Sequence, residues 1–307
     1  DEDYVAAVQH AEKYQSVPEY FRDCYNLGVN GNPIFPEVYT RPATAAGASI
    51  LAGKMLSEQT EGVIYSIGGG THHAHKAKAS GFCFFNDIVL GILEMLDNGI
   101  ERVIYVDLDA HHGDGVQDAF VDDNRVFTIS IHEEGRWPRT GDLTDRGSGA
   151  ARNLPVPKGF NDSELNEIIL KAILPLGLKF RPEAIVIQAG CDGLADDPQS
   201  KLELSNLALW KALKNLTQLA PRVLVVGGGG YNPWATARAW SGVWATLNNI
   251  DPVIDLPLEA TDVLKSLTWK HSRGRNPPEH WYSSIADKPN CGIVRDEILT
   301  IIEEVLK

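Results

Sequence analysis

Five short apolar runs, separated by longer segments with helical periodicity, are the feature that most constrains how this 307-residue chain folds. The runs are five or six residues long and rich in Val and Ile, which is typical of strands. We predict strands at residues 62–67 (a buried strand), 102–106, 126–131, 183–188 and 222–226. Strands that alternate with helices indicate an α/β protein. We therefore expect a three-layer fold, a mostly parallel open sheet covered by helices.

The segments around these runs have the 3.6-residue periodicity of helices. We predict helices at residues 1–14, 40–56, 87–96, 160–180, 205–219, 233–247 and 293–306, and a polar loop at 133–153. Residues 251–290 are rich in proline and charge. We therefore interpret 251–307 as a surface-wrapping extension of a single domain spanning 1–307. The chain opens without Met and already in a helical pattern, so we expect a natural N-terminal segment to be missing.

The amino-acid composition indicates which kinds of partner the chain can bind. The net charge is −13, from 28 basic and 41 acidic residues. This excess of acid disfavours nucleic acid, which needs a basic face. No run approaches the ~20 apolar residues of a membrane span, so no membrane partner is expected. Four widely spaced cysteines without a CxxC pattern favour free thiols and a cytoplasmic location. The oligomeric state stays open.

A cluster of ionisable residues follows the predicted strand at 102–106. In an extended chain, Asp107, Asp109 and His111 alternate and lie on one face. Such mixed nitrogen and oxygen ligands suit Zn²⁺, with Fe²⁺ as the alternative. Asp192, at another strand end, completes a site with an open position. The competing interpretation is that strand-end Asp and His residues are only caps and turn formers. Five of them within eight positions favour a metal site.

Two adjacent histidines, His72 and His73, follow the first predicted strand in a glycine-rich loop. Histidine transfers protons near neutral pH, especially when a carboxylate orients its second ring nitrogen. Asp107 and Asp114 are the natural orienting groups. A surface histidine pair without function is the alternative, and the loop's position at a strand end favours acid–base chemistry.

The glycine run at residues 227–231 superficially resembles a phosphate-binding loop. It lacks the GK[ST] sequence of a P-loop, so we reject nucleotide binding. The glycines instead let Tyr231 bring its hydroxyl toward a developing oxyanion.

Aromatic residues in and beside these loops have two interpretations. They are either ordinary core residues or the walls of a narrow apolar channel. We favour the channel for Phe82 and Trp137, and the core for Phe84 and Phe85.

Four motifs occur in order: GGGTHHAHKAKASGFCFFND, YVDLDAHHGDGVQDAF, the loop around Asp192, and GGGGYN. Together they resemble the metal-dependent histone deacetylase family over residues 1–250. The resemblance implies the arginase-like deacetylase fold. The stretch SIHEEGRWPRTGD is most similar to bacterial acetoin-utilisation-type deacetylases.

The resemblance implies a catalytic zinc ion held by Asp109, His111 and Asp192. The sister family, the arginase-like ureohydrolases, holds two manganese ions with DAHxD and DxD motifs. This chain has Gly113 and Leu194 where the second metal needs aspartates. The resemblance therefore implies one catalytic metal.

The same resemblance implies roles for the histidines and the tyrosine. His73 would be general base and then general acid, oriented by Asp114. His72, paired with Asp107, would be its electrostatic partner. Tyr231 would donate a hydrogen bond to the carbonyl oxygen of the substrate.

The resemblance also implies a substrate tunnel and a structural ion. Gly81 and Phe82 line the acyl-lysine tunnel in the family, and Trp137 stands where a second tunnel Phe is usual. A structural potassium ion is expected near Asp107, Asp109, His111, Ser130 and Ile131.

The implied activity is deacetylation of an acetylated amine, either acetyl-lysine in a protein or a small molecule. An acetylpolyamine amidohydrolase is the enzymatic alternative, and a pseudoenzyme that binds such ligands without turnover is the non-enzymatic one. Arg136 and Arg139 flank the unusual Trp137, which leaves the accepted substrate length open. Cys191, beside a predicted metal ligand, is also unusual, and its thiol is either oxidisable or a space filler.

Overall fold

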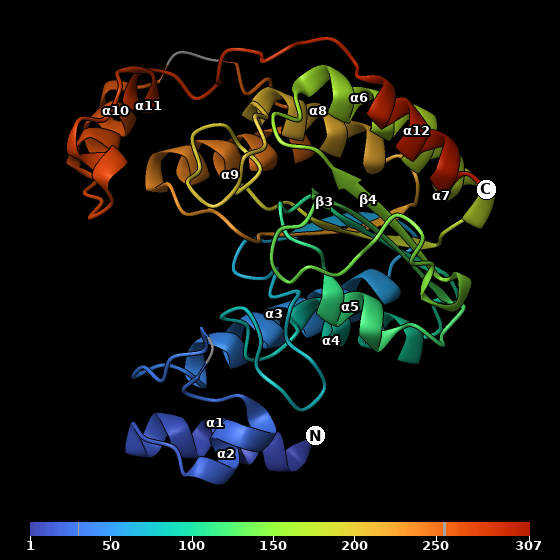
Figure 1. The fold of residues 1–307 in the computed structure, drawn as a ribbon, viewed down its shortest axis with the longest axis vertical. Helices are drawn as coiled ribbons and strands as arrows, with labels where there is room; N and C mark the ends of the chain where they lie inside the picture. The colour runs from blue at the N-terminus through green and yellow to red at the C-terminus, as the bar shows by residue number, and fades with distance from the viewer. Residues whose placement is uncertain (30, 254–255) are drawn as a thin grey trace.

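The computed structural model describes residues 1–29, 31–253 and 256–307, and a six-stranded sheet forms its centre (Figure 1). Neighbouring strands all pair in parallel, in the order β1-β6-β5-β2-β3-β4. The strands are β1 (Gly62–Ser66), β2 (Val103–Asp107), β3 (Val126–Glu133), β4 (Ala151–Val156), β5 (Ala184–Gln188) and β6 (Arg222–Val226). The predicted parallel, helix-covered sheet is confirmed.

Helices cover both faces of the sheet (Figure 1). One face carries α3 (Thr40–Ser57), α4 (Asp87–Asp97) and α5 (Asp114–Ala119). The other carries α6 (Asp162–Ile168), α7 (Leu174–Phe180), α8 (Asn206–Leu216), α9 (Pro233–Leu247) and α12 (Asp296–Val305). A π-helical turn at Ile169–Ile173 joins α6 to α7. The remaining helices are α1 (Glu2–Tyr14), α2 (Glu19–Tyr25), α10 (Leu258–Ser266) and α11 (His280–Ser283), with short 3-10 turns at Gly147–Gly149 and Ser272–Arg275.

The central strand β2 is buried along its whole length because it contributes to a core on each side of the sheet. Val103 and Tyr105 pack with α3 and α4, whereas Ile104 and Val106 pack with the helices of the opposite face. This period-two alternation continues past the end of the strand. It directs Asp107 and then Asp109 to the same side as Tyr105.

Two sequence predictions about strands were wrong. The segment 62–67 is not buried: β1 is an edge strand, and its Val63 side chain is 51% exposed. The segment predicted as a polar loop at 133–153 runs into the opposite edge strand, β4, which was missed. Its sequence ARNLPV includes Pro155 and a partly exposed Arg152. An edge strand tolerates both, because one side of its backbone needs no partner.

The C-terminal residues follow two different courses. α10 and α11 contribute Leu264 and Trp281 to a small cluster around Trp234 of α9. α12 buries Ile298 and Val305 in the main core, and the Arg152 guanidinium of β4 donates a hydrogen bond to the Val305 carbonyl. Residues 254 and 255 of the predicted extension lie outside the described residues. The division of the chain into one domain and an extension stays a prediction.

Candidate active site

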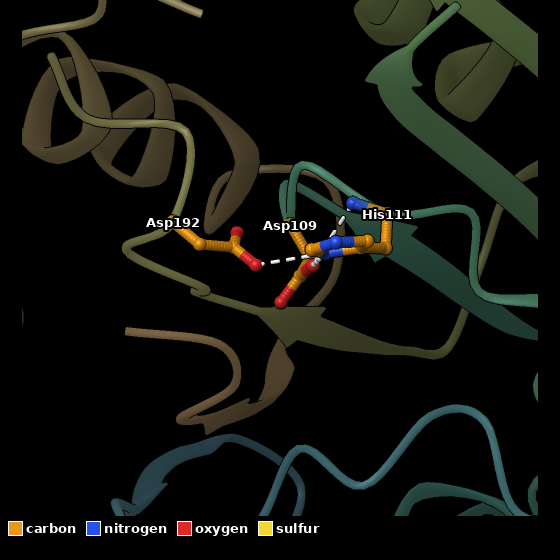
Figure 2. A group of neighbouring side chains, drawn as sticks. All are labelled: Asp109, His111 and Asp192. Atoms are coloured by element: carbon orange, nitrogen blue, oxygen red, sulfur yellow. Dashed lines mark hydrogen bonds and ion pairs between the residues drawn. The ribbon is translucent and has the colours of Figure 1, made fainter. Parts of the chain in front are cut away.

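The side chains of Asp109, His111 and Asp192 converge at the carboxyl edge of the sheet (Figure 2). The first two lie just beyond β2, and Asp192 approaches from the loop after the neighbouring strand β5. His111 Nδ1 lies 3.0 Å from an Asp109 carboxylate oxygen and 2.9 Å from one of Asp192. The structure thus brings together the three predicted metal ligands.

Backbone and side-chain donors hold the two carboxylates in place. Asp109 Oδ2 accepts hydrogen bonds from Gln188 Nε2 at 2.9 Å and from the Gly229 amide at 2.8 Å. Asp192 Oδ1 accepts one from the Ala110 amide at 2.8 Å. The opposite oxygen of each carboxylate faces His111 Nδ1. Each aspartate therefore presents one oxygen to a common point.

The charges at this point suit a divalent cation. Burial, followed by repulsion from Asp109, raises the pKa of the Asp192 carboxyl to about 7. Burial opposes a charge on His111, but its hydrogen bonds to both carboxylates outweigh this and raise its pKa to about 10. The buried carboxylates thus require positive charge between them, and the only ion pairs they form within the described residues involve histidine. One nitrogen and two oxygen ligands fit zinc and leave a coordination position open.

Two histidine–aspartate pairs lie beside the three ligands. His73 Nδ1 is 2.6 Å from an Asp114 carboxylate oxygen, and His72 Nδ1 is 2.7 Å from one of Asp107. Tyr105 also donates its hydroxyl hydrogen to Asp107, at 2.6 Å. Both predicted pairings are present, and each leaves Nε2 of its imidazole as the second ring nitrogen.

The two imidazoles differ in their affinity for a proton, although their ring centroids lie only 3.9 Å apart. Burial and then the neighbouring His72 charge lower the pKa of His73 to about 4. Burial opposes a charge on His72 as well, but Asp107 and Asp109 outweigh it and raise its pKa to about 9. The two shifts have opposite directions, so they favour the charged form of His72 and the neutral form of His73.

Gly113 has a structural role that the sequence did not indicate. Its φ of −76° is ordinary for any residue. A Cβ atom at this position, however, would lie 2.3 Å from an Asp107 carboxylate oxygen. The absence of a side chain therefore allows Asp107 to reach His72, besides removing the second-metal ligand of the arginase pattern.

A cleft of ≈960 Å³ opens over these groups, and Gly81, Phe82 and Trp137 line it. The Trp137 ring centroid lies 4.6 Å from that of His73. Gly81 has a φ of +55°, and a Cβ there would come within 2.5 Å of the Trp137 ring. Phe82 is 66% exposed in the cleft, whereas Phe84 is buried in the core. The aromatic residues favoured for the channel are thus the ones at the cleft.

Tyr231 also lines the cleft, beyond β6. Its backbone amide donates a hydrogen bond to Asp197 at 2.6 Å, which holds the loop. Burial and the charges of Asp109 and Asp192 raise the pKa of the Tyr231 hydroxyl above its ordinary value. The hydroxyl therefore keeps its proton and is a hydrogen-bond donor.

Two further predicted features lie nearby. Ser130 stands beside Asp107 in the β2–β3 register, and Ile131 follows it. The potassium ion predicted for this region stays a prediction. Cys191 is buried, and burial raises the pKa of its thiol well above the ordinary value. A buried, protonated thiol fills space and reacts slowly.

The fold and the site together define an α/β protein with a candidate metal centre at the carboxyl edge of a parallel sheet. The family model described as the histone deacetylase domain matches residues 1–247. The chain belongs to the histone deacetylase family, and this membership supports a deacetylase function and thus a hydrolase.

Relatives and solved structures agree with this assignment. Histone deacetylase 8 of Xenopus laevis is 39% identical over 229 residues, which cover 73% of this chain and 70% of the relative. Histone deacetylase 2 of rice is 38% identical over 247 residues, covering 78% of this chain and 48% of the relative. The crystal structure of a histone deacetylase homologue from Aquifex aeolicus has a TM-score of 0.92 and 35% identity, and the match covers 99% of this chain and 83% of that one. Within the described residues, no helix is both long and apolar enough to cross a membrane.

Proposed function

We propose that this protein is a zinc-dependent deacetylase that hydrolyses the amide bond of an acetylated amine, with Nε-acetyl-lysine of proteins as the leading substrate. The observation that carries the proposal is the presence of two buried histidine–aspartate pairs beside three converging metal ligands. Titratable pairs whose pKa values are pushed apart are typical of acid–base catalysis. Here both histidines line one cleft, and their pKa values shift in opposite directions.

Asp109, His111 and Asp192 would hold the zinc ion, which when bound supplies a Lewis acid for the acetyl carbonyl and for water. His73 then accepts the proton of the attacking water at Nε2, because Asp114 engages its Nδ1. The same nitrogen returns the proton to the departing amine, and acetate and a free amine result. His72 keeps its own proton and stabilises the negative charge that develops.

The remaining cleft residues would bind and orient the substrate. Tyr231 donates its hydroxyl hydrogen to the carbonyl oxygen as negative charge builds there. Trp137 and Phe82 pack on the methylene chain of the lysine, and Gly81 gives the chain room to pass. A potassium ion near Asp107 is proposed as a structural support for this edge of the sheet. Free thiols are consistent with a cytoplasmic location.

The alternatives receive less support. An acetylpolyamine is cationic, and the cleft mouth carries Arg139, Lys158 and Lys201. Like charges there would oppose such a ligand. A binding protein without turnover would need no complete acid–base set, whereas both histidine–aspartate pairs are present.

The test is acetate release by the zinc-loaded protein from an acetyl-lysine peptide and from acetylated polyamines. We expect release from the peptide, and a loss of about 10²–10⁴-fold in His73→Ala. Release from neither substrate by the wild type contradicts a deacetylase. Release from polyamines alone makes the acetylpolyamine amidohydrolase the correct assignment.

A further inference from the structure

The mouth of the cleft has a charge opposite to that of the whole chain. Outside the metal ligands and the histidine pairs, the charged side chains that line it are Glu133, Glu134, Arg136, Arg139, Lys158 and Lys201. Four are cations and two are anions, a sum of +2 (4 − 2), whereas the chain carries −13. The positive charge of these cleft residues therefore does not follow from the acidic composition of the chain.

One ion pair, between Glu133 and Arg136, neutralises part of this set. Glu133 is 3% exposed, and its carboxylate accepts hydrogen bonds from the Arg136 guanidinium at 2.8 Å and from the Lys201 amide at 2.6 Å. This carboxylate joins the loop after β3 to the loop that contains Lys201. Glu133 and Arg136 therefore neutralise each other's charge within the protein.

After this pair is set aside, three cations (Arg139, Lys158 and Lys201) and one anion (Glu134) remain among the residues that line the cleft. Their side chains are exposed, and no carboxylate of the described segments forms an ion pair with any of them. Cations that have no internal partner and line a binding cleft are available to a ligand.

Arg139 stands out among them because of its backbone. Its φ of +66° lies in the left-handed region, which a side chain with a Cβ disfavours and glycine occupies freely. Within the chain it contributes a backbone hydrogen bond, from its amide to Arg136 at 2.7 Å. Among the described residues, its guanidinium has no hydrogen-bond or ion-pair partner that would offset the strain, yet Arg139 lines the cleft two residues beyond Trp137. This combination favours a role for the guanidinium toward the substrate.

We propose that Arg139, with Lys158 and Lys201, selects acetylated amines that carry a carboxylate close to the acetylated chain. The inference rests on the proposed deacetylase function and narrows its substrate class. A guanidinium pairs with a carboxylate through two parallel hydrogen bonds, and the two ammonium groups add attraction at longer range. Such a carboxylate is either an acidic side chain beside the acetyl-lysine in a protein or the α-carboxylate of a small acetylated amine.

The experiment compares three acetyl-lysine peptides that differ only in the flanking residues, which are Glu, Gln or Lys. For the zinc-loaded wild type we expect kcat/KM to fall in that order, by about tenfold from Glu to Lys, mainly through KM. The spread should shrink when ionic strength is raised to about 0.5 M, because salt screens exposed charges. Fluorescence anisotropy of labelled peptides gives the same comparison as binding.

Matched variants test which residues cause the preference for the Glu peptide. Arg139→Gly removes the guanidinium at a backbone position that suits glycine, and should lower the ratio of kcat/KM for the Glu peptide to that for the Gln peptide about two- to fivefold. Lys201→Gln should lower this ratio similarly. Lys54→Gln removes the same charge from the exposed surface of α3, at a residue that does not line the cleft, and should leave the ratio unchanged.

The outcomes separate the two proposals. Equal kcat/KM for the three peptides together with no preference for free Nε-acetyl-lysine over its α-amide, or a preference that Arg139→Gly does not change, overturns the inference and leaves the deacetylase intact. Acetate release from none of the peptides contradicts the deacetylase, and anisotropy then decides the inference alone. A preference for free Nε-acetyl-lysine over its α-amide, without a preference among peptides, identifies the small-molecule source of the carboxylate.

Discussion

At the scale of single residues, the site depends on two histidines that are adjacent in sequence and whose pKa values are shifted in opposite directions. Their tilted rings lie only 3.9 Å apart, so a proton on one imidazole opposes a second proton on the other. The charge of Asp107 favours the proton on His72. Near neutral pH, His73 is therefore the histidine that can accept a proton, and His72 is the one that carries a proton.

The pH dependence of kcat/KM tests this assignment. The charged form of His72 is needed, so activity should be lost as pH rises through about 9, its raised pKa. The neutral form of His73 is needed, so activity should also be lost as pH falls through its lowered pKa of about 4. In Asp107→Asn the pKa of His72 falls, and the alkaline limb should move to lower pH. Tyr105→Phe keeps the carboxylate charge and should leave that limb in place.

The Tyr231 hydroxyl is predicted to act only as a hydrogen-bond donor. Tyr231→Phe removes that donor and retains the ring, so kcat should fall about 10²–10³-fold with little change in KM. Steady-state kinetics on the acetyl-lysine peptide measure both constants. Tyr14→Phe, at an exposed position on α1, is the control. A loss confined to KM would contradict the assignment.

The predicted site residues that the structure brings together belong to sequence motifs, whereas residues that reach the site through strand pairing were missed. The carboxylates and histidines stand in recognisable runs after strands. Gln188, which holds Asp109, has no motif. It reaches the site because β5 pairs with β2 and places it beside Asp107. Pairing register is set by tertiary packing, so a single sequence does not contain it.

At the scale of elements, the central strands were predictable and the edges were not. β2 and β5 are apolar throughout because both of their faces are covered. Of the two edge strands, β4 contains polar residues and was mistaken for a loop, whereas β1 is mainly apolar and was mistaken for a buried strand. α2 and α5 were also missed, since helices of seven and six residues give too little periodicity to detect.

The turn between β2 and α5 offers a test of close packing. Gly113→Ala should lower the free energy of unfolding by about 1–3 kcal/mol, because the new methyl group displaces the Asp107 carboxylate. Activity should fall as well, since His72 loses its partner. Gly47→Ala is the matched control: it adds a methyl group to an open position on α3 and should raise stability by up to about 1 kcal/mol. Denaturant titration measures both changes. Equal effects would contradict the steric argument.

At the scale of the whole molecule, the metal site joins parts of the chain that are distant in sequence. A ligand that binds only the folded state stabilises it, by about 4 kcal/mol at a free concentration 1,000 times Kd. We therefore expect zinc to raise Tm by several degrees and a chelator to reverse the change. Asp192→Asn should remove most of the zinc effect, whereas Asp122→Asn on the exposed surface should preserve it. An unchanged response in Asp192→Asn would exclude that carboxylate as a ligand.

The separation of 81 positions between His111 and Asp192 has a kinetic consequence. The ligands meet only after β2 and β5 have paired, and such long-range parallel pairing forms slowly. A contact that is absent from the folding transition state changes the unfolding rate and leaves the folding rate unaltered. Zinc should therefore slow unfolding in denaturant, followed by tryptophan fluorescence, without accelerating refolding. The ion would lengthen the lifetime of the native chain and would not guide its formation.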